Sequence, residues 1–390
     1  MTLSRIVLLL LALAAAPSSA PAHADQAPSP AELGFYVAVQ LDEQGQLDKA
    51  LPLYAARASE TLTQHDRLRY AAALLRAGQP EGAKAVFDRL ASEVGSVEHG
   101  SAGRAYAPAI CASTALLAGS PAVAVPYAHA ASAAERRDAG RRLLLVRALV
   151  AAGEPAAARP LLAGLAGEAG DWGDGQRIEL ARSELATGEV KAARMHLARA
   201  VPTSLGQMFQ DSVRANLAIR EHNWQKAAQV LEAAERKVPR SLADDRKVDG
   251  AWRNIQREVR SAALRRALAL WHLGKQPAAV AEARRASATD EEYVRAAASI
   301  LLAAAELAGD RPEDALSRLR VLAGHNHRFR APVDELARAL TDERRAVAPA
   351  VAALGAALAE SDRSLDFVTQ PLVEAFGEAA EHTAQLTRAS

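Results

Sequence analysis

Eight short segments recur along this chain, each opening with a turn-forming residue, glycine in six of them, and carrying an alanine five positions later. The alanines are Ala50, Ala83, Ala124, Ala158, Ala193, Ala227, Ala279 and Ala315. They are 33, 41, 34, 35, 34, 52 and 36 residues apart, so the period is close to 34 with two longer intervals. A period of this length is typical of chains built from stacked supersecondary units.

Each unit has the pattern of two helices joined by a short turn. In residues 67–93, apolar residues recur at every third or fourth position on both sides of Gly78, which predicts a helix, a turn and a second helix. A single hairpin leaves one apolar flank uncovered, so it is stable only when the next hairpin packs on it. The sequence therefore predicts an all-α chain, an α-solenoid of stacked helical hairpins that forms a superhelix with a concave and a convex face.

The spacing within the second unit matches a known repeat family. Gly78 is followed by Ala83 five residues later and by Phe87 four residues after that. This pattern resembles the tetratricopeptide repeat, and the match runs from about residue 31 to about residue 323. The resemblance implies a groove along the first helices of the hairpins, where peptide segments of protein partners bind.

The first residues have the pattern of a secretory signal peptide. Arg5 precedes an apolar stretch at 6–16, and a small-x-small motif ends at Ala24. The apolar run of 11 residues is shorter than the roughly 20 needed to span a bilayer. Asp25, not a cysteine, follows the cleavage site, so a lipid anchor is not expected. We expect cleavage near Ala24 and a periplasmic or secreted protein without stable membrane insertion, and a retained membrane anchor is the alternative.

The chain without its first 24 residues carries no net charge. Of the 47 basic and 46 acidic residues, only Arg5 lies in that segment, which leaves 46 of each. A balanced chain has no overall attraction to nucleic acid, so nucleic-acid partners are not expected. The lone Cys111 cannot form a disulfide within the chain, and its apolar neighbours predict a small core residue.

The sequence lacks the short motifs that accompany common catalytic and cofactor sites. It contains no GxxxxGK[ST], GxGxxG, HExxH, GxSxG or CxxC segment. We therefore expect no enzyme activity, no cofactor and no metal ion. His325 and His327, in the segment GHNHRFR, offer two ligands without a third, and we expect them in a solvated loop between helices.

Three successive units carry a polar residue at the same place in their first helix. These residues, six positions before each turn residue, are Arg147, Arg182 and Asn216, and Arg220 follows one helical turn after Asn216. Stacked units repeat position for position, so we expect the four side chains to form a ladder on the concave surface. Guanidinium groups bind carboxylates, which makes an acidic peptide or another carboxylate-bearing segment the expected ligand. Exposed arginines that only keep the helices soluble are the alternative.

A second candidate surface is the most basic stretch of the chain, residues 236–266, which holds ten basic and four acidic side chains. Within it, Arg253, Arg257 and Arg260 are spaced to share one helix face. Such a face would bind an acidic protein, an anionic glycan or a membrane surface. The alternative is a solvated helix face without a ligand.

Together these features predict three segments and one kind of function. The segments are a signal peptide at 1–24, a tetratricopeptide-like solenoid of about eight hairpins at 25–332, irregular around 91–105 and 236–266, and capping helices with a polar tail at 333–390. We expect an exported, non-enzymatic periplasmic scaffold for protein–protein interactions in envelope or secretion-complex assembly. The alternatives are an envelope enzyme that acts on peptidoglycan or another glycan, and a glycan-binding solenoid without turnover.

Overall fold

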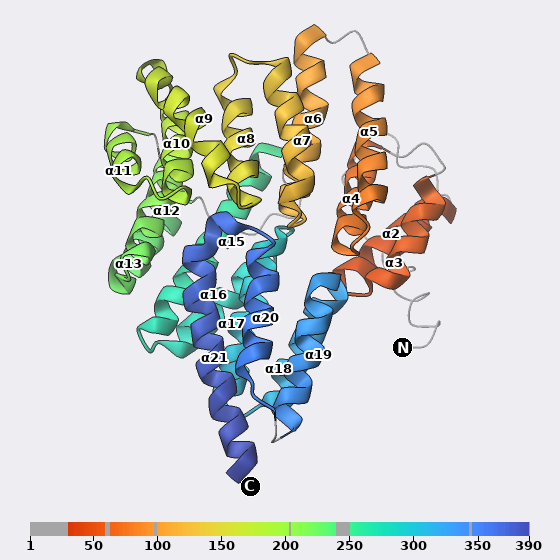
Figure 1. The fold of residues 1–390 in the computed structure, drawn as a ribbon, viewed down its shortest axis with the longest axis vertical. Helices are drawn as coiled ribbons and strands as arrows, with labels where there is room; N and C mark the ends of the chain where they lie inside the picture. The colour runs from red at the N-terminus through yellow and green to blue at the C-terminus, as the bar shows by residue number, and fades with distance from the viewer. Residues whose placement is uncertain are drawn as a thin grey trace, which may run out of the picture.

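The computed structural model describes residues 30–58, 63–96, 100–202, 204–238, 250–342 and 345–389. Within these ranges all regular secondary structure is helical, which confirms the all-α prediction. The helices pair into eight stacked hairpins, numbered 1 to 8 in chain order (Figure 1). The pairs are α2 (Pro30–Glu43) with α3 (Leu47–Ala58), α4 (Gln64–Arg76) with α5 (Pro80–Ser96), α6 (Gly100–Leu117) with α7 (Pro121–Ala134), α8 (Ala139–Ala151) with α9 (Pro155–Glu168), α10 (Asp174–Ala186) with α11 (Val190–Arg199), α12 (Ser204–Arg220) with α13 (Trp224–Glu235), α15 (Gly250–His272) with α16 (Gln276–Ser287), and α17 (Glu292–Ala308) with α18 (Pro312–His325).

The turn of every hairpin contains a residue with a left-handed backbone conformation. These residues have φ angles between 53° and 88°, and they are Gly45, Gly78, Gly119, Gly153, Gly188, His222, Gly274 and Asp310. They are the same residues that open the eight recurring segments of the sequence. Glycine adopts positive φ without the Cβ clash that other residues meet, which explains its use in six of the turns.

The eight recurring alanines are at most 1% exposed. Each lies near the start of the second helix of its hairpin, where only a small side chain lets two helices approach closely. The repeat in the sequence therefore identified both the turns and the close helix contacts. The 41-residue interval contains the long helices α5 and α6, of 17 and 18 residues, and the 52-residue interval contains α15, of 23 residues.

Five further segments follow the eighth hairpin: the short 3-10 helices η2 (His327–Phe329) and η3 (Arg363–Leu365), and the helices α19 (Arg330–Thr341), α20 (Ala348–Ala359) and α21 (Asp366–Ala389). α19 packs on α18, while α20 and α21 pack on α17. Val368, Leu372 and Phe376 of α21 are at most 1% exposed, so this helix has an apolar face despite its polar composition. These helices cover the last hairpin.

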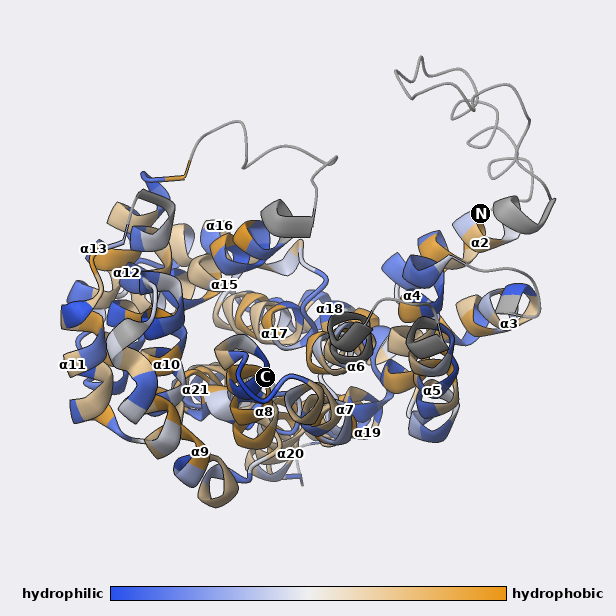
Figure 2. Cartoon of the chain, turned by 90° about the horizontal axis from the view of Figure 1, so that it is seen from above, coloured by the Kyte–Doolittle hydropathy of each residue, from blue (hydrophilic) through white to orange (hydrophobic). Residues whose placement is uncertain are grey.

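The chain curls so that the segments around η2 and η3 reach the turns of hairpins 1 to 4. We call this contact the seam, formed by the turns at Gly45, Gly78, Gly119 and Gly153 on one side and by residues 324–330 and 361–363 on the other. Seen from above, α17 lies near the middle of the molecule, with α9, α11 and α13 on one outer side and α3 and α5 on the other (Figure 2). The superhelix therefore closes on its own carboxyl-terminal part.

Buried apolar side chains form separate cores on the two sides of the seam. One cluster extends from Ala71 to Leu180, in hairpins 2 to 5, and another from Ala263 to Ala384, in hairpins 7 and 8 and the helices after them. Cys111 is fully buried in the first of these clusters, as predicted. Among the described residues, no such cluster has members on both sides of the seam.

Two predictions are not tested by the structure. The signal peptide at 1–24 lies outside the described residues. The division of the chain at residue 332 stays a prediction. No helix among the described residues combines the length and the apolar composition needed to cross a membrane.

Candidate functional site

The four residues of the predicted ladder lie on α8, α10 and α12, the first helices of hairpins 4 to 6. Three of them contact a later part of the same chain. Arg182 and Asn216 bind residues of α15, and Arg220 lies over the ring of Phe367 at the start of α21. The ladder therefore exists along one side of the stack, and its nearest neighbours belong to this protein.

Glu258 of α15 is the centre of a buried charge network. Its carboxylate oxygens lie 3.0 Å from Arg182 Nη1 and 2.9 Å from Arg265 Nη2. Arg265 Nη1 also donates to Asn216 Oδ1 at 2.6 Å, and Ser212 Oγ donates to Glu258. Burial alone would raise the pKa of Glu258, but Arg182, Arg265 and the Ser212 hydroxyl hold it well below its ordinary value. The polar groups of Arg182 and Asn216 thus bind residues of α15.

Arg220 makes a different contact. Its guanidinium carbon lies 4.7 Å from the centroid of the Phe367 ring, within the range of a cation–π interaction. Burial lowers the pKa of Arg220 from its ordinary value, and Asp366 acts in the opposite direction. α21 therefore covers the end of the ladder.

Arg147 is the ladder residue that remains accessible. Its side chain is exposed and has no hydrogen bond or ion pair among the described residues. Its electrostatic neighbours are Glu291, just before α17, and Asp362, just before η3, and η3 itself contacts α8. Burial raises the pKa of Glu291 to about 7, Arg147 opposes that rise, and Asp362 adds to it. A free guanidinium thus lies beside two carboxyl groups whose charged forms are disfavoured by burial.

The structure differs from the open groove expected along the first helices. The concave side is covered by α15, η3 and α21 because the superhelix curls onto its later helices. Three of the four ladder side chains consequently contact groups within the chain. Neither the expected ligand-binding ladder nor the alternative of exposed, solubilising arginines included such contacts. Their role in binding a separate protein stays a prediction.

The described basic residues of the stretch bind other groups of the same chain. Arg257 Nη2 lies 2.6 Å from Asp290 Oδ2, and Arg260 Nη1 donates to the backbone oxygen of Arg285 at 3.0 Å. The side chain of Arg253 lies outside the described residues. The other described basic residues of the stretch form the pairs Arg236–Glu232, Lys237–Asp211, Arg265–Glu258 and Arg266–Glu235. Each described basic side chain of this stretch therefore has a partner within the chain, and a ligand for the stretch stays a prediction.

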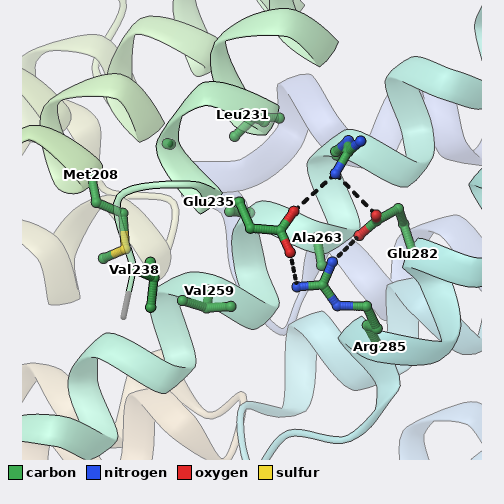
Figure 3. Close-up of a pocket in the computed structure, with 11 residues that line it drawn as sticks. Met208, Leu231, Glu235, Val238, Val259, Ala263, Glu282 and Arg285 are labelled. Carbon is green, nitrogen blue, oxygen red and sulfur yellow. Dashed lines mark hydrogen bonds and ion pairs between the residues drawn. The ribbon is translucent and has the colours of Figure 1, made fainter. Parts of the chain in front are cut away.

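A small cavity lies between α12, α13, α15 and α16, beside the same stretch (Figure 3). Its apolar lining includes Met208, Leu231, Val238, Val259 and Ala263. On the other side, two arginines and two glutamates alternate in a ring of ion pairs: Arg266, Glu235, Arg285 and Glu282. The cavity has a volume of about 20 Å³, close to the space of a single water molecule, and the charges beside it bind each other.

The histidine segment differs in part from the solvated loop that was expected, because His325 is buried whereas His327 is exposed. His325 and Asn326 are 7% and 1% exposed, and Asn326 Nδ2 donates to Glu292 Oε1 at 3.2 Å. His327 Nδ1 donates to the backbone oxygen of Arg76 at 2.9 Å. Burial, followed by the effect of nearby Arg295, lowers the pKa of His325 to about 4. His325 and Asn326 are buried because the turns of hairpins 1 and 2 pack against this segment, and these turns are more than 200 residues away in the chain.

The described residues include no group of three or more His, Cys, Asp or Glu side chains placed to hold a metal ion. Sequence reasoning missed Glu258 and Arg265 as neighbours of the ladder. A signal for them existed, since they stand seven residues apart in one helix and so share a face. Glu291 and Asp362 lie just before helices, where acidic residues are common because they interact favourably with the helix dipole. Their positions in the sequence therefore did not indicate a site.

Comparisons with known proteins show a distant helical likeness. No family model matches the chain, and no curated protein matches it. The chain is similar to one in the structure described as "Crystal structure of APC/C hetero-tetramer Cut9-Hcn1", with 12% sequence identity and a TM-score of 0.40. The similarity covers 76% of this chain and 53% of that chain, so this chain spans about half the length of the one it matches. A likeness at this level implies nothing about activity or partners.

Proposed function

We propose that this chain is an exported, periplasmic scaffold without catalytic activity that binds a protein partner during the assembly of an envelope or secretion complex. The proposal of export rests on the signal-peptide pattern of residues 1–24. The proposal of partner binding rests on the stacked hairpins, since stacks of this kind offer extended surfaces for binding. The single observation that carries it is the unpaired, exposed guanidinium of Arg147 on the inner side of hairpin 4.

The surroundings of Arg147 limit the chemistry of the ligand. A carboxylate of the partner would bind the guanidinium with charge-assisted hydrogen bonds. Glu291 and Asp362 lie within electrostatic range of Arg147, so a basic group next to that carboxylate would find acidic neighbours. The expected ligand is therefore a peptide segment in which an acidic residue is flanked by a lysine or an arginine.

A capture experiment tests the proposal. The protein without residues 1–24 is immobilised and incubated with envelope extract from its source, and the captured proteins are compared with those taken by an Arg147→Glu variant. Arg199→Glu is the matched control, because Arg199 is also exposed but lies on α11, the second helix of its hairpin. Both variants make the same change of charge. Arg182→Glu is unsuitable, since it would disrupt the pair with Glu258.

We expect a protein that is captured by the parent and by Arg199→Glu and lost with Arg147→Glu. Its sequence should contain the predicted acidic and basic pair. Equal capture by all three proteins would contradict a site at Arg147, and an Arg253→Glu variant would then test the basic stretch. Capture of no protein at all would contradict the scaffold function.

A further inference from the structure

The seam joins hairpins 1 to 4 to the carboxyl-terminal part through polar contacts. Arg330 Nη2 lies 2.9 Å from Asp48 Oδ1, and His327 donates to the Arg76 oxygen at 2.9 Å. Arg328 Nη1 donates to the Gly119 oxygen at 3.0 Å. Three successive turns thus each meet one basic residue of the segment 327–330. Since the apolar cores lie on either side of these contacts, separating the seam leaves both cores intact.

Four buried polar atoms at the seam have no hydrogen-bond partner among the described residues. They are Asp42 Oδ1, Arg76 Nε, Arg295 Nε and His325 Nδ1. The four residues surround Glu292, which is fully buried and binds Arg295 and Asn326. A buried polar atom without a partner is costly, and water would reach these atoms if the seam separated.

The seam also controls access to the ladder. η3 contacts α8, which carries Arg147, and Phe367 at the start of α21 covers Arg220. The stack itself continues from hairpin 4 through hairpins 5 and 6 to α15, so it does not depend on the seam. Moving η3 and the start of α21 away would uncover Arg220 and widen the approach to the exposed Arg147 without breaking the stack.

We infer that the superhelix opens along the seam, and that the open form presents Arg220 to a partner together with the already exposed Arg147. The second part rests on the proposed function, whereas the opening itself does not. In the closed form the carboxyl-terminal helices occupy the inner side of the stack and compete with the partner. Opening is a separation of two intact bodies at a polar contact, which proteins undergo more readily than the disruption of an apolar core.

Two turn glycines provide a matched pair of variants. Gly78 has φ = 76°, and a Cβ atom at this position would lie 2.6 Å from His327 Nε2. Gly188 has φ = 88°, and a Cβ atom there would meet nothing within 4 Å. Alanine causes a similar backbone strain at both positions, but only Gly78→Ala pushes against the seam. Because His327 is held by the Arg76 oxygen, its ring cannot move without losing that hydrogen bond.

Distances between two spin labels report the opening. The labels are placed on cysteines introduced at Tyr36 in α2 and Val321 in α18, which are 64% and 51% exposed and lie on opposite sides of the seam. Cys111 is fully buried, so it does not react with the label. We expect double electron–electron resonance to show a longer distance in a larger fraction of Gly78→Ala molecules than in the parent or in Gly188→Ala. Adding His327→Ala removes the clash, so the double variant should match His327→Ala alone.

The same variants test the role of the open form. Gly78→Ala should capture several-fold more of the Arg147-dependent partner than Gly188→Ala does. Identical distance distributions in the two alanine variants would overturn the opening. A longer distance without increased capture would overturn the competition between the carboxyl-terminal helices and the partner. If Arg147→Glu captures as much as the parent while Gly78→Ala still opens, the proposed function fails and the opening stands.

Discussion

At the residue scale, Glu258 shows how a charge in this protein can be structural. It is 6% exposed and lies between Arg182 and Arg265, and Arg265 is itself 4% exposed. We predict that Glu258→Gln lowers the free energy of unfolding by about 3–5 kcal/mol, because it leaves the guanidinium of Arg265 buried without a counter-charge. Denaturation by urea measures the change.

The control for this prediction uses the same arginine. Glu179 lies 3.6 Å from Arg182 Nε, but its side chain is 43% exposed. Glu179→Gln should therefore cost less than about 1 kcal/mol, the usual range for a surface ion pair. Similar losses for the two variants would show that the interior of the network is not desolvated.

Glu291 makes the stability of the protein depend on pH. Burial raises its pKa from 4.5 to about 7, so between these values the native state binds more protons than the unfolded state. The contribution of this group to stability therefore falls as the pH rises through that interval. We predict that Glu291→Gln stabilises the protein near about pH 8, by at most about 3 kcal/mol at about 1.36 kcal/mol per pKa unit, and has little effect near about pH 5. Melting temperatures at the two pH values test this, and an equal shift at both would contradict it.

At the scale of single elements, the close contacts between helices depend on alanine. Ala158, at the start of α9, is fully buried, while the adjacent Ala157 is exposed. We predict that Ala158→Leu costs roughly 1–3 kcal/mol, because the larger side chain overpacks the contact between helices. Ala157→Leu should change the stability by less than about 0.5 kcal/mol. Equal melting temperatures for the two variants would contradict the assigned positions.

The elements could be predicted because their signals are local. A turn residue, an alanine five positions later and helical spacing on both sides all lie within one hairpin, so even His222 and Asp310 were found as turn residues in place of glycine. The seam could not be predicted in this way. The sequence around His327 does not indicate its hydrogen bond, because the neighbouring residues are polar and the partner is a carbonyl oxygen that becomes available only where α4 ends.

The candidate site was predicted in part for the same reason. The positions of Arg147, Arg182 and Asn216 followed from the repeat, since each stands six residues before a turn. Their neighbours depend on the curvature accumulated over several hairpins, which no single unit encodes. The sequence therefore indicated which side chains share a surface and not what covers that surface.

At the scale of the whole molecule, the helices after hairpin 8 protect the apolar surface of α17. Val368, Leu372 and Phe376 of α21 are buried, and α21 packs on α17. We predict that a chain ending at residue 365 self-associates, because this surface becomes exposed. A chain ending at residue 385 is the control, since it loses only the end of the helix, where Leu386 is 44% exposed. Light scattering after gel filtration distinguishes the two, and a monomeric chain of 365 residues would contradict the covering role.

The closed seam also restricts how such a chain can evolve. An open solenoid can gain or lose a unit at its ends with little effect on the others, because each unit contacts only its neighbours. Here Arg76, Gly119 and Asp48 of hairpins 1 to 3 each bind a particular residue of one short segment. Duplicating a hairpin between hairpins 3 and 8 would move that segment away from all three turns at once. The closed seam thus fixes the number of repeats in this protein. The chain can become longer only where an added unit leaves these three contacts in place.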